Sequence, residues 1–319
     1  MAESTRYYIY CLLTVLISLP AIGNAQSAVN IQNNKTGKNG SLTTGVLRIG
    51  IFTDCQYCDC EISGKRNYRL SLKKLDTCIA VFNSLPLDAV LHLGDMIDHS
   101  YKNFDSVLPR FTSIKTPLNL VLGNHDYMIN NKRKPELISM LGMPGGYYMA
   151  EYGGWDFIVL NGDDLSYFAP QDRQKKDERN DMISDLYLNL HFNGMPWNGG
   201  IGRQQMQWLE ERLKDADSAG RKVIVCCHFP LFGKEDHLLF NCKEVFSLIS
   251  RHPSVKAYFN GHYHSGGYEE KGGIHFVNFK GMVDTEQNAF GVVTLSRDSI
   301  IIEGYGRETS RKLKIRQRP

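Results

Sequence analysis

The sequence lacks an apolar run long enough to cross a membrane. Its N-terminal apolar run, residues 7–19, is shorter than the roughly 20 residues that a transmembrane helix needs. Arg6 precedes this run, and Pro20 and the small residues of 21–25 follow it. That order is typical of a secretory signal peptide cleaved after Ala25, the alternative being an uncleaved anchor. We therefore expect residues 1–25 to direct export, giving a periplasmic or secreted protein without a stable membrane anchor.

The sequence also lacks a strong excess of charge. It has 37 Lys and Arg against 34 Asp and Glu, a net charge of +3. Proteins that bind nucleic acid usually carry a dense basic stripe, so we expect no nucleic-acid partner. An apolar fraction of 42% and a charged fraction of 22% are ordinary for a globular protein. No protein partner is evident from the sequence.

The sequence lacks the cysteine pattern of a disulfide scaffold, although its number of cysteines would suit an oxidising compartment. The chain has eight, and the predicted cleavage removes one and leaves an odd number. Cys226 and Cys227 are adjacent in an apolar run, which favours burial as small apolar residues. Cys55, Cys58 and Cys60 crowd one segment, where a disulfide and a zinc site both remain open. No second Cys/His cluster at metal-ligand spacing completes a zinc site there.

No internal repeat or low-complexity linker divides the chain after its first 45 residues. Residues 26–45 are rich in Asn, Gly, Thr and Lys and predict a flexible leader. Beyond them, short apolar runs alternate with segments of helical period, which predicts one α/β domain over residues 46–308. Apolar residues spaced 4, 3, 4 and 3 from Tyr68 to Phe82 predict a helix, and residues 204–213 predict another. Residues 162–200 are expected to be irregular and functional, and residues 309–319 to be a solvated basic tail.

Five apolar runs each end in residue types that bind metal ions. The runs cover residues 46–53, 88–93, 118–122, 222–227 and 256–260. They are followed, in order, by Asp54 and Gln56, by Asp95 and Asp98, by Asn124 and His125, by His228, and by His262 and His264. Because ligands bind beyond the carboxyl ends of strands in α/β sheets, we expect these side chains to converge. Carboxylate, amide and imidazole groups suit Mn, Fe or Zn. They outnumber the ligands of one ion, which favours two ions bridged by a carboxylate.

The ordered motifs D-x-Q, GDxxD, GNHD, H and GHxH resemble those of the calcineurin-like metallophosphoesterase superfamily. The resemblance implies an α/β four-layer sandwich, with two mixed β-sheets flanked by helices. It implies one ion held by Asp54, Gln56 and His264, and a second held by Asn124, His228 and His262, with Asp95 bridging. It also implies that His125 stabilises charge or protonates the leaving oxygen while Asp98 orients it. Gln56 stands where His is usual, and this weaker ligand is expected to leave the first ion more labile or more open to substrate.

Segments outside these motifs resemble the manganese-dependent ADP-ribose/CDP-alcohol diphosphatases. They include DCQYCDC at 54–60, GKRNYRLSL at 64–72, NGDDLS at 161–166, WNGG at 197–200, QxxxWL at 204–209 and GHYHSGGY at 261–268. The resemblance implies hydrolysis of the pyrophosphate bond in ADP-ribose, CDP-choline or a similar nucleotide by a metal-bridging hydroxide. It implies two divalent ions, manganese first, with Fe, Zn or Mg as alternatives.

Other activities remain open at the level of the sequence. The same superfamily contains phosphomonoesterases and cyclic-nucleotide phosphodiesterases, and an inactive metal-binding protein is an alternative of another class. The corresponding motif of the purple acid phosphatases resembles GDxxY, with Tyr as its last residue. This chain has Asp98 at that position, so a purple acid phosphatase is disfavoured.

A nucleotide substrate requires contacts to phosphate and to the base. We expect Arg66 and Arg69 to approach the second phosphate, since guanidinium groups bind phosphate through paired hydrogen bonds. We expect Trp197, Tyr268 or Phe168 to stack on the base. The alternative is that both arginines are solvated helix residues and that Trp197 packs within a loop.

Overall fold

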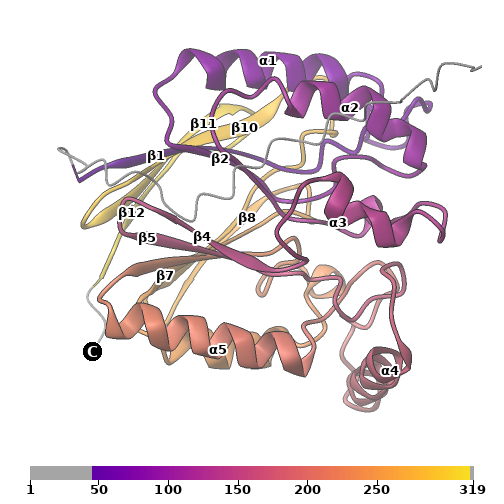
Figure 1. Ribbon diagram of the computed structural model, residues 1–319, viewed down its shortest axis with the longest axis vertical. Coiled ribbons are helices and arrows are strands. Elements are labelled where there is room, and N and C mark those ends of the chain that lie inside the picture. Colours follow the sequence, from indigo (N-terminus) through magenta and orange to yellow (C-terminus); the bar gives the residue numbers. More distant parts are fainter. Residues whose placement is uncertain (1–44, 317–319) are drawn as a thin grey trace, which may run out of the picture.

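The computed structural model describes residues 45–316. The predicted signal peptide and almost all of the predicted leader therefore lie outside the described residues. The described chain forms two six-stranded β-sheets. Figure 1 shows helices α1 (Ser71–Ser84) and α2 (Phe104–Phe111) over one sheet and α5 (Arg203–Ser218) over the other. The prediction of two mixed sheets flanked by helices is confirmed.

The first sheet has the strand order β12-β11-β10-β1-β2-β3. Its strands are β1 (Leu47–Phe52), β2 (Ala89–His92), β3 (Leu118–Leu120), β10 (Ala289–Leu295), β11 (Ser299–Gly306) and β12 (Arg311–Lys314). The first three are parallel to one another, and β10 pairs with β1 antiparallel. Strands covered on both faces read as nearly continuous apolar runs, as β1 and β2 do.

The second sheet has the strand order β4-β5-β6-β7-β9-β8. Its strands are β4 (Tyr148–Tyr152), β5 (Trp155–Val159), β6 (Lys222–Cys226), β7 (Val255–Asn260), β8 (Gly267–Lys271) and β9 (Ile274–Asn278). Strands β5, β6, β7 and β9 run parallel, and α6 (Cys242–Ser250) connects β6 to β7. Parallel neighbours place their carboxyl ends at one edge, so β6 and β7 deliver their following loops together.

The apolar core has two main parts. The larger contains buried residues of both sheets, such as Ile51 and Leu91 from the first and Phe259 from the second, together with α1 and α2. The smaller lies between the second sheet and helices α5 and α6. Both sheets are thus covered on two faces, which leaves the loops at the strand ends as the place where polar groups gather.

Two predictions about local structure are wrong. Residues 162–200, expected to be irregular, contain helix α4 (Arg173–Leu188), which begins where the Asp172 carboxylate accepts the Lys175 backbone N–H. Only Ile183 and Leu186 of this helix are buried, so it carries almost no apolar stripe for sequence periodicity to detect. Within the predicted solvated tail, β12 instead pairs with β11 because Leu313 packs into the core, only 6% exposed.

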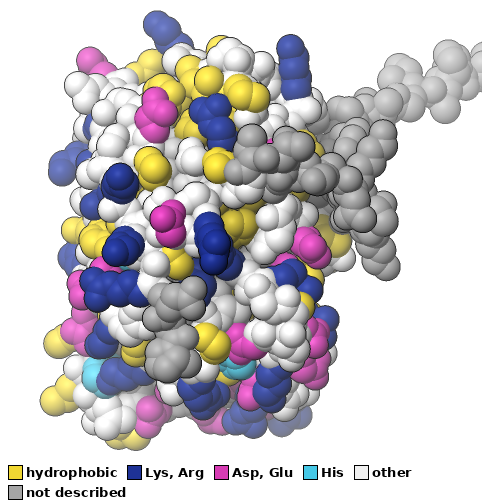
Figure 2. Space-filling model, turned by 90° about the vertical axis from the view of Figure 1, so that its left-hand side faces the viewer, with side chains coloured by type: hydrophobic (Ala, Val, Ile, Leu, Met, Phe, Trp, Pro, Cys, Tyr) yellow, Lys and Arg dark blue, Asp and Glu magenta, His cyan; other side chains and the backbone are white. Residues whose placement is uncertain are grey.

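The remaining described elements are short. They are α3 (Leu137–Met140) and the 3₁₀ turns η1 (Tyr101–Asn103), η2 (His125–Tyr127), η3 (Lys134–Glu136) and η4 (Glu235–His237). Across residues 45–316, no helix has the length and apolar character needed to span a membrane. On the face seen in Figure 2, Lys and Arg side chains are scattered among Asp and Glu. The expectation that nucleic acid is not a partner stays a prediction.

Candidate metal centre

The seven predicted metal ligands lie just beyond the carboxyl ends of strands from both sheets. Asp54, Gln56, Asp95 and Asn124 follow β1, β2 and β3, whereas His228, His262 and His264 follow β6 and β7. Backbone hydrogen bonds from Asp54 N to Gly94 O and from Gln56 N to Asp95 O hold the first two loops side by side. All seven are inaccessible or nearly so, the most exposed being His264, whose side chain is 10% exposed. The structure therefore brings the predicted ligands to one buried place.

The ligand atoms are within reach of shared ions. Those of Asp95, His228 and His262 all lie within 4.8 Å of one another. His264 Nε2 is 3.3 Å from Asp54 Oδ1, and Gln56, whose amide oxygen is the candidate ligand atom, donates from Nε2 to Asp95 Oδ2 at 2.9 Å. These contacts place Asp95 between the two predicted groups of ligands, in agreement with a bridging position.

The backbone at this centre adopts an unfavourable conformation. Asp54, Gln56, Asp95 and His262 have φ values of 50°, 39°, 59° and 68°. Residues other than glycine seldom occupy this left-handed region, and each such residue costs of order 1–3 kcal/mol. Strain of this kind concentrates at functional sites, and it aims four side chains inward that extended strands would direct elsewhere.

Each histidine ligand has a partner on its other ring nitrogen. His228 Nδ1 hydrogen-bonds to the Leu93 carbonyl oxygen at 2.8 Å, and His262 Nε2 lies 2.9 Å from Asn198 Oδ1. His264 Nδ1 lies 2.9 Å from Asp284 Oδ1. Such partners fix the ring orientation and leave the opposite nitrogen free for a metal. Sequence reasoning missed Asn198, although it lies in the quoted WNGG segment, and it missed Asp284 entirely.

Asp126 joins two of the metal-binding loops. Its buried carboxylate accepts the backbone N–H groups of Asp95, Met96 and Gly123 at 2.9–3.0 Å. Burial first, and then the negative charge of Asp95, raise the pKa of Asp126 to about 7. Asp126, the last residue of the GNHD motif, therefore holds the loop after β2 against the loop after β3. Its place in the motif suggests such a role, although Asp126 is not one of the predicted metal ligands.

The electrostatics of the centre favour cations. Burial lowers the pKa of His228, but the carboxylates of Asp95 and Asp54 raise it more, to about 10. Burial also lowers the pKa of His264, and Asp54 and Asp284 raise it more, to about 9. Both imidazoles are therefore protonated at neutral pH, and divalent ions would displace these protons because a metal binds neutral imidazole.

Several buried polar atoms of the centre have no hydrogen-bond partner within residues 45–316, namely Asp54 Oδ1, Gln56 Oε1, Asn124 Oδ1 and His228 Nε2. Asp54 Oδ1 and His228 Nε2 have only charge contacts, at 3.3 Å from His264 Nε2 and 3.2 Å from Asp95 Oδ2. An unpaired buried polar atom costs about 1–3 kcal/mol, so the two amide oxygens in particular indicate ligands that await a partner. With carboxylate, amide and imidazole donors gathered in one place, the residues fit two divalent ions.

His125 and Asp98 lie beside this centre. His125 Nδ1 hydrogen-bonds to the Asp98 backbone oxygen at 2.8 Å and lies 3.0 Å from Asp98 Oδ1. Its backbone N–H donates to Asp95 Oδ1 at 2.9 Å. Burial lowers the pKa of His125, but Asp95 and Asp98 raise it overall, which favours a protonated ring able to donate. The arrangement suits the predicted roles, which stay predictions.

The predicted arginines differ in their surroundings. Arg66 Nη1 lies 3.9 Å from Asp98 Oδ1, so its guanidinium borders the predicted catalytic pair of His125 and Asp98. Arg69 instead pairs with Asp59 and Glu61, each at 2.6 Å, and its side chain is 51% exposed. The described contacts thus link Arg66, but not Arg69, to the residues of the centre.

The predicted aromatic residues also differ. The Trp197 ring lies 6.4 Å from the His237 ring at an interplanar angle of 53°, and the His237 ring lies 5.4 Å from the ring of His262. Tyr268, on edge strand β8, contacts His275 through its hydroxyl and Arg311 through its ring. The carbonyl of Phe168 accepts a hydrogen bond from Lys134. Within residues 45–316, Trp197 alone of the three is linked to a predicted ligand through ring contacts.

Two mixed sheets that jointly present such a set of metal-binding side chains define a metal-dependent phosphoester hydrolase. The chain belongs to the calcineurin-like phosphoesterase family, whose model matches residues 47–266. Membership agrees with the prediction of two divalent metal ions and confirms the family predicted from the five motifs.

The relatives and solved structures extend over most of the chain. The manganese-dependent ADP-ribose/CDP-alcohol diphosphatase of Mus musculus is 29% identical, over 83% of this chain and 92% of the relative. The protein of the same name from Arabidopsis thaliana is 27% identical, over 83% and 96%. A dimetal phosphatase from Danio rerio has a similar fold, with a TM-score of 0.77 at 23% identity, over 85% of this chain and 99% of that one.

Proposed function

We propose that this protein is a manganese-dependent hydrolase of the pyrophosphate bond in nucleoside diphosphate-linked compounds such as ADP-ribose and CDP-choline. The observation that carries the proposal is the similarity to relatives of that name, which covers at least 92% of the Mus musculus and Arabidopsis thaliana proteins. The buried ligand set described above supplies a site for the metal. Export of the protein, expected from residues 1–25, is part of the proposal.

The residues of the chain support this reaction in three ways. When bound, the metal ions would neutralise the attacked phosphate and lower the pKa of the attacking water. His125, whose pKa is raised by the carboxylates of Asp95 and Asp98, would donate to an oxygen of the phosphate that is attacked or leaves. Arg66 lies 3.9 Å from Asp98, beside the predicted catalytic pair, and its guanidinium could bind a second phosphate there through two hydrogen bonds.

The base end of the substrate has a candidate platform in the aromatic group formed by Trp197, His237 and Tyr263. The ring centroids of His237 and Tyr263 are 5.1 Å apart, and Trp197 is 40% exposed. Because every base has an aromatic face, stacking on such a platform tolerates both adenine and cytosine. Tolerance of both bases is what activity on ADP-ribose and on CDP-alcohols requires.

The test uses purified residues 26–319, stripped with a chelator and resupplied with Mn²⁺. ADP-ribose, CDP-choline, a cyclic nucleotide and p-nitrophenyl phosphate are compared, with His125→Ala as the blank. Metal-dependent cleavage of the first two substrates is expected. Preference for the cyclic nucleotide or p-nitrophenyl phosphate would replace the proposal with a phosphodiesterase or phosphomonoesterase. Cleavage of none would indicate an inactive metal-binding protein.

A further inference from the structure

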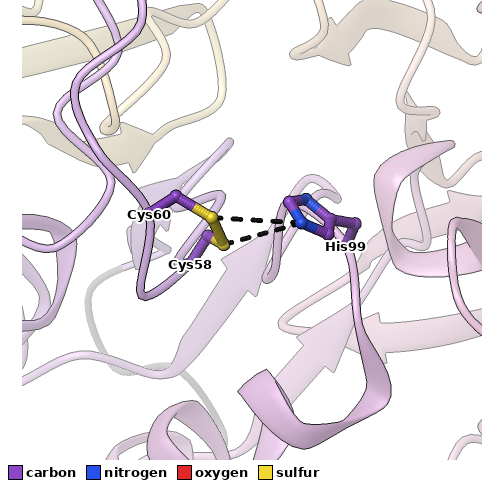
Figure 3. Close-up of side chains that lie close together, drawn as sticks. All are labelled: Cys58, Cys60 and His99. Atoms are coloured by element: carbon purple, nitrogen blue, oxygen red, sulfur yellow. Dashed lines mark hydrogen bonds between the residues drawn. A yellow bond between two sulfur atoms is a disulfide. The ribbon is translucent and has the colours of Figure 1, made fainter.

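A second group of metal-binding side chains lies next to the catalytic pair. Cys58 and Cys60 form a disulfide, and His99 Nε2 lies 3.8 Å and 3.9 Å from their sulfur atoms. Figure 3 shows the imidazole of His99 directed at both sulfurs. The sequence left a disulfide and a zinc site both open at these cysteines. The structure supplies the ligand that the zinc site lacked.

The spacing of these atoms suits a tetrahedral metal ion. With metal–sulfur distances of about 2.3 Å and metal–nitrogen distances of about 2.0 Å, a tetrahedral ion separates nitrogen and sulfur ligands by about 3.5 Å. The observed separations exceed this value by a few tenths of an ångström. Once the disulfide is reduced, the two sulfurs must move apart to bind an ion, whereas His99 already lies at a suitable distance.

The orientation of His99 is fixed by a carboxylate. Its Nδ1 lies 2.5 Å from Asp98 Oδ2, and because an ionised carboxylate only accepts, Nδ1 must carry the hydrogen. In the tautomer with hydrogen on Nδ1 alone, the lone pair of Nε2 is directed toward the sulfurs. A carboxylate behind an imidazole is the arrangement that orients metal-binding histidines. It is an observation independent of the two cysteines, and it points to a cation.

We propose that Cys58, Cys60 and His99 form a further cation site, distinct from the dinuclear centre, for a borderline ion such as Zn²⁺. Two thiolates and an imidazole are the donors that such ions prefer. Cys58 is buried at 4% exposure, whereas the side chain of His99 is 49% exposed, so water takes the fourth position. The site exists only in the dithiol form of the protein.

The formation of the site balances as two steps. A phosphine reductant transfers two electrons to the disulfide and, with one water, yields two thiols and the phosphine oxide. The divalent ion then displaces the two thiol protons and binds as a dithiolate. Cys60 is partly exposed, which gives a reductant access to the bond.

The site has a direct connection to the reaction centre. Asp98 contacts His99 through one carboxylate oxygen and lies beside His125 through the other. An ion on Nε2 of His99 would hold Asp98 in the position from which it orients His125. Occupancy of the site is thereby linked to the catalytic pair without a shared ligand.

The test is cobalt binding by the purified chain 26–319, already loaded with Mn²⁺. Co²⁺ is titrated before and after treatment with a non-chelating phosphine, and thiolate-to-cobalt charge-transfer absorption in the near ultraviolet is recorded. We expect one further equivalent of cobalt to produce this band, only in the reduced protein. Free thiols are counted after denaturation to establish that reduction is complete. No band in fully reduced protein would overturn the proposal.

Variants separate this site from other thiols. Cys58→Ser and Cys60→Ser are expected to abolish the band, and His99→Ala to shift its titration to higher cobalt concentration. Cys242→Ser removes a buried free cysteine on α6 and serves as the matched control, which should keep the band in full. A band that survives Cys60→Ser would place the thiolate elsewhere and overturn the proposal. Because the readout is cobalt absorption, failure here leaves the proposed diphosphatase activity untouched, and the reverse also holds.

Discussion

At the scale of single residues, the metal centre depends on side chains that none of the metal motifs contains. Asp284 accepts from His264 Nδ1 and contributes to the raised pKa of that ring. We predict that Asp284→Asn weakens metal binding by about 10–100-fold, because loss of the carboxylate makes His264 a poorer and less oriented ligand. The measurement is the free Mn²⁺ concentration that gives half-maximal activity.

Asp217→Asn is the matched control for this variant. It removes the carboxylate of another histidine pair, Asp217 with His252 at 2.6 Å, at the end of α5. The half-maximal Mn²⁺ concentration of this control should not change. An unchanged value in Asp284→Asn as well would show that His264 is oriented without its carboxylate partner.

Arg66 offers a second test at this scale. Its guanidinium borders Asp98, whereas Arg69, three residues later, pairs with Asp59 and Glu61 at the surface. We predict that Arg66→Ala raises KM for ADP-ribose about tenfold or more, since a hydrogen bond to a charged group contributes about 1.5–3 kcal/mol. Arg69→Ala should leave KM near that of the parent protein. If both variants change KM by equally small amounts, Arg66 has a structural role and does not bind the phosphate.

The sequence predicted the candidate ligands that the structure brings together, but not the residues that orient them. Each ligand directly follows an apolar run, so the five motifs point to them in order. Asn198 and Asp284 lie in loops that follow none of those five runs. They contact His262 and His264 because the fold brings together segments that are distant in the sequence. Lys74 is a further example, since its buried ammonium on α1 donates to the carbonyls of Met282 and Thr285 and fixes the loop that carries Asp284.

At the scale of elements, the end of a strand must leave room for an ion. A Cβ added at Gly123 would lie 2.2 Å from Asp95 Oδ1 and 2.8 Å from His228 Nε2. We predict that Gly123→Ala reduces kcat/KM by about 100-fold or more, because displacing ligands by about 1 Å is that costly. Gly194→Ala is the control, as its added Cβ would meet nothing closer than 3.8 Å. Wild-type activity in Gly123→Ala would mean that Asp95 and His228 are not required.

The junction between α5 and β7 offers a prediction about pH. Asp217 accepts from the Ser254 backbone N–H at 2.9 Å and from His252. Burial raises the pKa of Asp217, but its hydrogen bonds to Ser254 and His252 lower it more, so the pKa is lower in the folded protein than in the unfolded one. The ionised form therefore stabilises the fold above the normal pKa, and that stabilisation is lost as pH falls through the depressed pKa.

The variant Asp217→Asn isolates this contribution. At neutral pH we expect it to lower the free energy of unfolding by about 1 kcal/mol, the size of one net hydrogen bond. The difference should shrink as pH falls below the unperturbed Asp pKa of about 3.9 and approaches the depressed pKa of the folded protein. Urea unfolding at neutral pH and at a series of lower pH values measures it, and a difference that stays constant through the series would contradict the assignment.

Periodicity predicted some elements and missed others for identifiable reasons. The helix predicted from Tyr68 to Phe82 corresponds to α1, which buries Leu75, Ile79 and Phe82. Helix α4 was missed because it buries only two apolar residues, and β12 because a single buried leucine marks it among basic residues. Local pattern reports what an element buries, so elements that bury little leave little pattern.

At the scale of the whole molecule, the centre depends on how the two sheets face each other. The sequence indicated that five strand ends converge, but the strands divide as three from one sheet and two from the other. Pairing between non-consecutive strands, such as β1 with β10, is set by contacts far apart in the chain. The resemblance to a known superfamily predicted two sheets, whereas alternation of runs alone predicted only an α/β domain.

Because both sheets contribute predicted ligands, bound metal ions should hold the two sheets together and stabilise the fold. Asp95 comes from the loop after β2, and His228 from the loop after β6, with 3.2 Å between Oδ2 and Nε2. An ion that binds only the folded chain stabilises it by RT ln(1 + [L]/Kd), or about 2.7 kcal/mol at 100 times Kd. We predict that saturating Mn²⁺ raises Tm by about 5–10 °C over chelated protein, given roughly 2–4 °C per kcal/mol for a domain of 150–250 residues. His228→Ala should abolish the shift, while Gly194→Ala should retain it. Differential scanning calorimetry at several Mn²⁺ concentrations measures the effect. A Tm that does not respond to Mn²⁺ would mean that the ions are not shared between the sheets.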